Sequence, residues 1–441
     1  MNFLRDIADQ ARRAVVDVLD GAAIERDCPF SPDVPEDVRQ WMPDIFDRFP
    51  IVLPWASPQP VDPSQHQVWI FDNTAFRAPS KADRKQLELA APEKDDQTEP
   101  VVRSADGALQ RAGDRSGWEV ELVAAYFVKD SGSETSRVVA QLARLLHIGE
   151  SDVASRERIA ARLEPFTATV LPKRTVRVAV GDAERQTLGP SNYSGISQAV
   201  HALHIAPPRV PDMWTTAPVD VPASASMPGH TVFAEAEGWG VISDIDDTIK
   251  VTQSPSPLGI LHNTFVVDQP EPVAGTPELY ARIDTALDRP AWFYLSASPY
   301  NLYPFLKRFR DAHFPCGTMI LRNASWQNLG GLIASLQRGT QAYKVSRVSK
   351  IHSWFPGRRF IAIGDSTQSD PESYGECARR FPGWFRAIFI RRVEGIDDEL
   401  DEAEKNSDAR FEKAFAGLDR GLWRVYTDAS ELAPLVDDLT R

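Results

Sequence analysis

The chain has 441 residues and a formal net charge of −13 at pH 7, which argues against a nucleic-acid-binding protein and against simple electrostatic docking to anionic membranes. Its length suggests two or three domains, and 42% hydrophobic residues are enough for packed cores. The three cysteines have neither the spacing of a zinc site nor that of a disulfide framework, which indicates a reducing, cytoplasmic compartment.

The first predicted unit, residues 1–80, begins with an amphipathic helix. Apolar residues between positions 3 and 22 recur mostly every three or four residues, but the polar face lacks the basic excess of a membrane-surface helix, so we expect it to pack on the protein or on a partner. Charged residues also exclude a signal peptide here, and no stretch is apolar and long enough to span a bilayer. Residues 68–71 predict a strand.

Residues 81–117 are polar and charged with few large apolar side chains, and we expect a disordered linker there. A β-rich accessory domain with a helical insertion is predicted over 118–206. Its signals are alternation over 118–128, an amphipathic pattern over 137–147 and strand-forming residues over 170–180.

A proline-rich, extended connector is predicted over 207–237, because five prolines lie between positions 207 and 222 and periodicity is weak. Residues 208–211 fit the minimal P-x-x-P pattern of ligands for SH3-type domains, although such matches are common by chance. The connector leads into a catalytic domain predicted over 238–441, where strands and helices alternate as in a parallel sheet covered by helices on both faces.

An apolar run ends in carboxylates at Asp244 and Asp246, followed by Thr248. Successive strand residues alternate faces, so the two carboxylates point the same way from a strand end, as a metal-assisted nucleophile and a general acid require. A calcium loop is disfavoured because its Gly and Glu positions hold Ile249 and Pro255. A solvated acidic turn is the plainer alternative.

Two further apolar runs end in polar residues. The first ends near Ser296, whose hydroxyl can donate to a phosphate oxygen, and near Ser298, which we interpret as a helix cap before a proline. The second ends at Asp365, and Asp365 with Asp370 can bind Mg²⁺ directly or through water. Asp370 is equally well interpreted as a turn residue before proline.

A predicted helix between these runs opens with Lys344, a compact positive charge suited to a phosphoryl group. Lys350 is the competing candidate, roughly on the opposite side of that helix.

Together these residues resemble the four motifs of the haloacid dehalogenase superfamily in order and spacing. The sequence around these residues is closer to one branch of the superfamily. It looks like the catalytic domain of the actin patch family of phosphatidate phosphatases in four segments: SDIDDTIKVT, YLSASPYNLYPFL, YKVSRVSKI and FIAIGDSTQSDPESY. Lipins are more distantly similar. The resemblance is strong over 238–374 and covers the first hundred residues only loosely.

The resemblance implies a role for each matched residue. Asp244 is expected to attack phosphorus, giving an aspartyl-phosphate, while Asp246 protonates the leaving alkoxide and its backbone carbonyl faces Mg²⁺. Thr248 is expected to fix the loop. The phosphoryl oxygens are assigned to Ser296 and Lys344, and the rest of the magnesium site to Asp244, Asp365 and Asp370.

The gaps between these motifs are too short for a large cap domain, so we expect an open site with only a flap over residues 252–274. An open site suits a phosphate on a large body, such as phosphatidate or another lipid phosphate at a membrane surface, or a phosphoprotein. The remaining alternative is a non-catalytic scaffold at membrane or cortical actin sites, bound through the proline-rich connector to an SH3-type or actin-patch protein.

Overall fold

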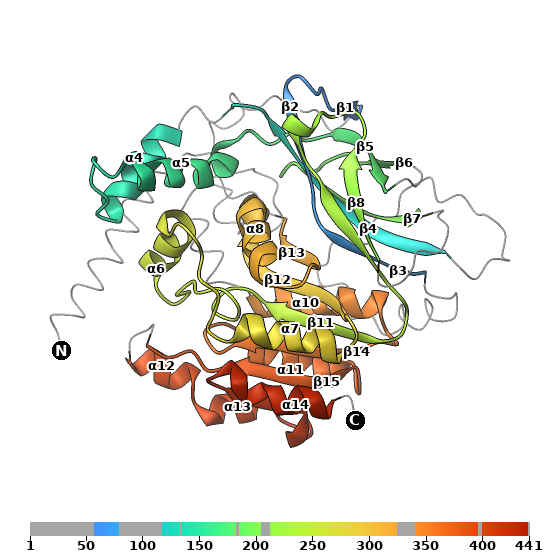
Figure 1. Cartoon of the computed structure of the whole chain (residues 1–441), viewed down its shortest axis with the longest axis vertical. Helices are drawn as coiled ribbons and strands as arrows, with labels where there is room; N and C mark the ends of the chain where they lie inside the picture. The colour runs from blue at the N-terminus through green and yellow to red at the C-terminus, as the bar shows by residue number, and fades with distance from the viewer. Residues whose placement is uncertain are drawn as a thin grey trace, which may run out of the picture.

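The computed structural model describes residues 57–78, 117–131, 135–181, 185–203, 212–323, 340–395 and 399–439. The helix predicted near the N-terminus, nearly all of the linker predicted over 81–117 and the P-x-x-P segment lie outside these ranges. Two sheets organise the rest, a six-stranded one in the C-terminal half and a ten-stranded one built from the strands that precede it in the chain (Figure 1). Among the described residues, no helix is both long and apolar enough to cross a bilayer.

The six-stranded sheet is parallel throughout, in the order β13-β12-β11-β14-β15-β16. Its strands are β11 (Trp239–Asp244), β12 (Ala291–Pro299), β13 (Thr318–Arg322), β14 (Arg359–Asp365), β15 (Phe385–Arg391) and β16 (Trp423–Tyr426). Strands in such a sheet are buried on both faces and therefore read as continuous apolar runs, which is why the sequence revealed them. The predicted α/β class with a parallel sheet is confirmed.

Helices cover both faces of this sheet. They are α6 (Pro257–Leu261), α7 (Thr276–Ala286), α8 (Tyr303–His313), α10 (Thr340–Trp354), α11 (Asp370–Arg380), α12 (Glu399–Lys405), α13 (Asp408–Ala414) and α14 (Ala433–Asp438). Alternate residues of one strand serve opposite cores: Val241 packs in the cluster that includes α7, α8 and α14, whereas Ile242 packs in the cluster with α10, α11 and α13. The central strand β11 is thereby held rigidly from both sides.

The ten-stranded sheet has the order β1-β5-β8-β10-β3-β4-β2-β9, with β6 beside β5 and β7 beside β4. Its strands are β1 (Gln59–Pro60), β2 (His66–Ile70), β3 (Asn73–Arg77), β4 (Trp118–Val128), β5 (Arg174–Val180), β6 (Arg185–Leu188), β7 (Ile196–Leu203), β8 (Met213–Pro218), β9 (Ser226–Met227) and β10 (Gly229–Ala234). The helices α4 (Thr135–Leu145) and α5 (Val153–Thr167) are inserted between β4 and β5.

This arrangement corrects the extended connector predicted over 207–237. Strands β8 and β10 lie inside that range and pair with each other, and β8 also pairs with β5. The prolines allow this because Pro218 is the last residue of β8 and Pro222 lies outside the strands. The sheet therefore takes strands from all three ranges 1–80, 118–206 and 207–237.

Candidate active site

The carboxylates of the site stand at the carboxyl edge of the parallel sheet. Asp244 is the last residue of β11 and Asp365 the last residue of β14, and these strands are neighbours. Ser296 lies near the end of β12, on the other side of β11. Parallel sheets of this kind bind ligands at this edge, so topology alone brings residues from three separate motifs together.

Three carboxylates form the floor of the site. Single carboxylate oxygens of Asp244, Asp365 and Asp370 lie within 4.8 Å of one another, and all three side chains are buried. Lys344 reaches them from α10 and donates hydrogen bonds to Asp244 Oδ1, at 2.7 Å, and to Asp370 Oδ1. Lys344 rather than Lys350 therefore occupies the site, since Lys350 pairs with Glu121 of β4.

Asp370 belongs to this floor and is not an exposed turn residue. It is the first residue of α11, and its Oδ2 accepts a hydrogen bond from the backbone N–H of Asp365 at 3.0 Å. Gly364 makes this approach possible, because a Cβ at that position would lie 2.3 Å from Asp370 Oδ2. In the sequence, the glycine immediately before Asp365 was the signal that another group approaches the backbone closely at this point.

The electrostatics of the floor follow from burial and crowding. Burial raises the pKa of Asp244 well above its usual range, the ammonium of Lys344 lowers it in part, and the neighbouring carboxylates raise it further. Burial and Asp370 likewise raise the pKa of Asp365. Burial alone would lower the pKa of Lys344, but the carboxylates of Asp244 and Asp370 raise it overall, so the lysine stays charged. Three carboxylates against one ammonium leave an excess of negative charge that favours a cation.

Asp246 lies in a cradle of hydroxyl groups. Its Oδ1 accepts a hydrogen bond from Thr252 Oγ1 at 2.8 Å, and its Oδ2 accepts from Ser296 Oγ at 2.8 Å and Ser298 Oγ at 3.2 Å. Lys250 Nζ donates to Thr252 Oγ1 at 2.7 Å and lies 3.7 Å from Asp246 Oδ1. Three donors in fixed positions leave the carboxylate one orientation.

Sequence reasoning missed three members of this cradle. Ser298 was interpreted as a helix cap, but it lies in β12 and its hydroxyl faces Asp246. Lys250 and Thr252 were passed over, although both are almost fully buried. Asp244, Asp246 and Thr248 are spaced by two residues, and Lys250 and Thr252 continue the same spacing. This repeat was the sequence signal that could have identified them. Ser296, expected to hold phosphoryl oxygens, donates instead to Asp246 in this structure.

The loop after β11 is held by the side chains of Asp247 and Thr248. Asp247 has a left-handed φ of 60°, and its carboxylate accepts the backbone N–H groups of Thr252, Gln253 and Ser254 at 2.6–2.9 Å. Thr248 Oγ1 donates to Asp365 Oδ2 at 3.1 Å and so links the loop to β14. The solvated-turn alternative is wrong, because Asp244 and Asp246 are only 1% and 5% exposed.

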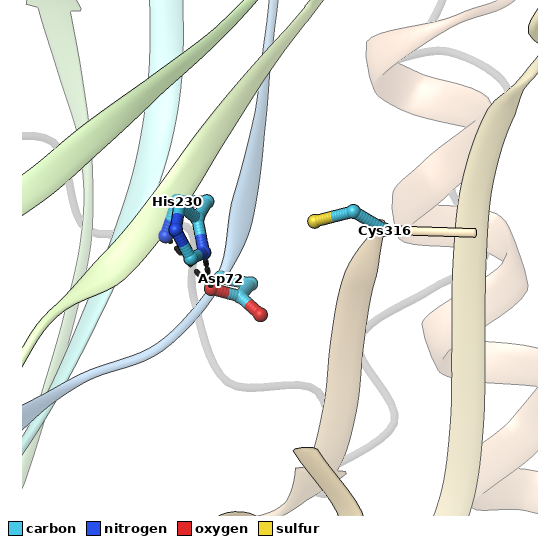
Figure 2. Close-up of side chains that lie close together, drawn as sticks. All are labelled: Asp72, His230 and Cys316. Atoms are coloured by element: carbon cyan, nitrogen blue, oxygen red, sulfur yellow. Dashed lines mark hydrogen bonds and ion pairs between the residues drawn. The ribbon is translucent and has the colours of Figure 1, made fainter. Parts of the chain in front are cut away.

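A second group of potential metal ligands lies away from this site. Asp72, His230 and Cys316 place one ligand atom each within 4.8 Å of one another, but the thiol comes from a different segment and makes no contact drawn to the other two (Figure 2). Asp72 Oδ2 already accepts hydrogen bonds from Lys307 Nζ at 2.7 Å and Arg310 Nη2 at 2.5 Å. The ammonium of Lys307 and the guanidinium of Arg310 already neutralise this carboxylate and oppose a metal ion, so the group serves as an ionic link between β2–β3 and α8.

Comparison with known proteins adds to this geometry. Residues 239–392 match the family model described as the catalytic domain of phosphatidate phosphatase APP1, and this range contains every site residue from Asp244 to Asp370. The phosphatidate phosphatase APP1 of Saccharomyces cerevisiae is 33% identical over 172 residues, which are 38% of this chain and 28% of the yeast protein. An uncharacterized protein of Schizosaccharomyces pombe is 27% identical over 164 residues, 36% of this chain and 26% of that protein.

The two alignments thus span little more than a quarter of each relative's length. Within the matched segment the family model and the yeast relative confirm the resemblance to a phosphatidate phosphatase family that the four motifs indicated.

Proposed function

We propose that this chain is a Mg²⁺-dependent phosphatidate phosphatase of the haloacid dehalogenase type, which releases diacylglycerol and phosphate through an aspartyl-phosphate intermediate. One observation carries the proposal. Asp244 ends β11 against Lys344 and two carboxylates, and Asp246, two residues later, is held by three hydroxyls. Two carboxylates in such different surroundings suit different tasks.

The reaction needs a nucleophile and a proton donor. A carboxylate oxygen of Asp244 forms a bond to phosphorus while the bond from phosphorus to the glycerol oxygen breaks. Protonated Asp246 gives its proton to that departing oxygen. Water then attacks phosphorus, Asp246 takes a proton from it, and the bond between Asp244 and phosphorus breaks to release phosphate.

The donor set fits a magnesium ion. Asp244, Asp365 and Asp370 offer hard carboxylate oxygens in a small buried volume, and the backbone carbonyl of Asp246 is the expected further ligand. When bound, the ion would supply charge neutralisation for an anionic nucleophile approaching an anionic phosphate. Lys344 supplies part of that neutralisation from the protein itself, since it is buried against Asp244.

The short segment between β11 and β12 supports a substrate with a large body. All of residues 245–290 are described, and there the chain forms α6, the π-helix η3 (His262–Val266) and α7 without a further domain. The lack of a cap domain in this segment is compatible with a phosphate presented at a lipid surface, and so with peripheral association of a cytoplasmic protein with membranes. The name of the yeast relative favours phosphatidate among such substrates.

The test is phosphate release from phosphatidate in mixed micelles by the intact chain, by Asp244→Asn and by Asp288→Asn, with Mg²⁺ and with a chelator. Asp288 is exposed in the turn before β12, and asparagine readily adopts its φ of 54°. Asp288→Asn is therefore the matched control, because it makes the same chemical change away from the site. Activity that requires Mg²⁺ and Asp244 but not Asp288 supports the proposal.

The other outcomes separate the alternatives. Release from an aryl phosphate or a phosphopeptide but not from phosphatidate keeps the chemistry and discards the lipid. No release from any of these substrates favours the non-catalytic scaffold at membrane or actin sites.

A further inference from the structure

The flap, residues 252–274, is held by α5, the helix inserted between β4 and β5 of the ten-stranded sheet. Arg162 of α5 donates from Nη1 to the backbone carbonyls of Thr264 at 3.0 Å and Val267 at 2.6 Å, and from Nη2 to that of Asp268 at 2.8 Å. These carbonyls lie at the end of η3, where a helix leaves its last carbonyl groups without partners. Arg162 therefore caps the flap helix from outside.

A second arginine one turn earlier on α5 reinforces this contact. Arg158 Nη1 donates to the carbonyl of Val266 at 2.7 Å, and its Nε lies 3.0 Å from Asp268 Oδ1. The rings of Phe166 and Phe265 meet edge to face with centroids 5.9 Å apart. Figure 1 shows the α4–α5 pair beside α6. The contact thus combines apolar packing with hydrogen bonds from charged donors, which are stronger than neutral ones.

The same helix also contacts the segment that follows β12. Asn301 Nδ2 donates to the carbonyl of Pro165 in α5 at 2.7 Å. Asn301 follows β12 by two residues, and β12 carries the Ser296 and Ser298 hydroxyls that hold Asp246. The Arg162 guanidinium lies 4.6 Å from the ring centroid of Phe305, at the start of α8.

Both contacts of α5 lead to the same carboxylate. On the flap side, Asn263 of η3 donates to the carbonyl of Thr252 at 3.3 Å, and the Thr252 hydroxyl donates to Asp246. On the other side, the path runs from Asn301 to the serines of β12. Asp246 is thus oriented by two segments that share α5 as their outer support.

We propose that Arg162 is a positioning residue for Asp246: by fastening the flap to α5, it keeps the Thr252 hydroxyl, and with it the general acid, in place. This inference rests on the proposed function, because it assigns Asp246 the task of protonating the leaving group. It also gives the helical insertion of the ten-stranded sheet a role in the chemistry of the other sheet.

The test compares two leaving groups in the intact chain with Arg162→Ala, Arg162→Lys and Arg156→Ala. An alkoxide leaving from phosphatidate needs a proton, whereas nitrophenolate leaves with little help, so loss of acid catalysis affects the first substrate selectively. Arg156 is the matched control, since it lies on the same helix and its side chain has no hydrogen bond to the described flap residues. Pre-steady-state bursts isolate the phosphorylation step for both substrates.

We expect Arg162→Ala to slow the diacylglycerol burst about 10-fold and the nitrophenolate burst less than about 2-fold, a loss typical of an imperfectly placed general acid. Arg162→Lys should behave similarly because lysine cannot donate through a planar fork. Amide hydrogen exchange of residues 262–268 should accelerate about 10-fold in both Arg162 variants and stay unchanged in Arg156→Ala.

Unchanged flap exchange in Arg162→Ala, or equal slowing of both bursts, would overturn the inference. If the unmodified chain releases neither product, the proposed function itself is wrong. The exchange measurement needs no turnover and still decides whether Arg162 holds the flap, so the two failures are distinguishable.

Discussion

The ammonium group of Lys344 lies 2.7 Å from Oδ1 of Asp244, and both side chains are almost completely excluded from solvent. A buried pair of this kind is sensitive to loss of either partner, because the remaining charge is left in a medium that solvates it poorly. Here the consequence is larger than for an isolated pair, since Asp365 and Asp370 also depend on this one ammonium.

Replacing Lys344 with methionine should therefore affect both stability and activity. We expect the free energy of unfolding to fall by about 3–5 kcal/mol and phosphatase kcat/KM to fall by about 100-fold or more, since one electrostatic donor in a dry site is worth that much. Urea unfolding and phosphate release measure the two effects. Lys350→Met, on the same helix but paired with Glu121 outside the site, should leave kcat/KM within about 2-fold of the unmodified chain, although it also breaks a largely buried pair and should lower stability. Equal losses of kcat/KM in the Lys344 and Lys350 variants would contradict the assignment of Lys344 to the active site.

The Thr252 hydroxyl is expected to be needed for the orientation of Asp246. Thr252→Val keeps the shape of the side chain but removes the hydroxyl that bridges Lys250 and Asp246, and we expect kcat to fall about 10- to 100-fold while KM changes little. Thr252→Ser retains the hydroxyl and should recover most of the rate. Steady-state kinetics on phosphatidate micelles distinguish the two, and a serine variant as slow as the valine variant would show that the hydroxyl is not what matters.

Magnesium is expected to stabilise the folded chain. A ligand that binds only the folded state at 100 times its Kd adds about 2.7 kcal/mol to the free energy of unfolding. Thermal unfolding with and without Mg²⁺ should reveal this increase in the unmodified chain and its loss in Asp365→Asn, which removes a charged oxygen ligand. Calorimetric titration provides the binding constant directly. Stabilisation of Asp365→Asn by Mg²⁺ to the same extent would exclude Asp365 as a ligand.

The ionic link at Asp72 should make stability depend on pH. Burial alone would raise the pKa of Asp72, but the hydrogen bond from His230 and the charges of Arg310 and Lys307 hold it well below 3.8. The unfolded chain then takes up the proton first as the pH falls, so this carboxylate stabilises the fold fully above about pH 5 and loses its effect progressively below about pH 4. Comparison with Asp72→Asn isolates the effect.

We expect Asp72→Asn to lower the free energy of unfolding by about 3 kcal/mol at pH 7, and the difference from the unmodified chain to shrink between pH 5 and pH 3. Urea unfolding at a series of pH values measures both quantities. A difference that stays constant over this pH range would mean that the asparagine acts through packing and not through the lost charge.

Local sequence was enough to locate the carboxylates of the site. A parallel strand buried on both faces produces an uninterrupted apolar run, and the polar residue that ends it marks the carboxyl edge of the sheet. Asp244 and Asp365 were found in this way, and Asp246 followed from the two-residue period of an extended chain. The structure places Asp244 and Asp365 at the ends of β11 and β14, and locating them needed only neighbouring residues.

The strands of the ten-stranded sheet were recovered less completely. β4 was predicted with its observed bounds, and its first seven residues alternate between buried and partly buried positions. β8 was missed because it is only six residues long and lies among prolines, and its pairing partners in β5 and β10 are set by the fold as a whole. Short strands depend on such partners more than on their own propensity.

The sequence by itself determined which residues stand at the ends of the central strands, and hence the kind of chemistry that the site can support. Only the tertiary structure decided what holds those residues in place. The Ser298 and Thr252 hydroxyls donate to Asp246, and Arg162 donates hydrogen bonds to the flap. The reason is one of distance along the chain. Periodicity records contacts between near neighbours, whereas Arg162 meets Val267 across 105 positions and Ser298 meets Asp246 across 52, and such pairs leave no local pattern to read.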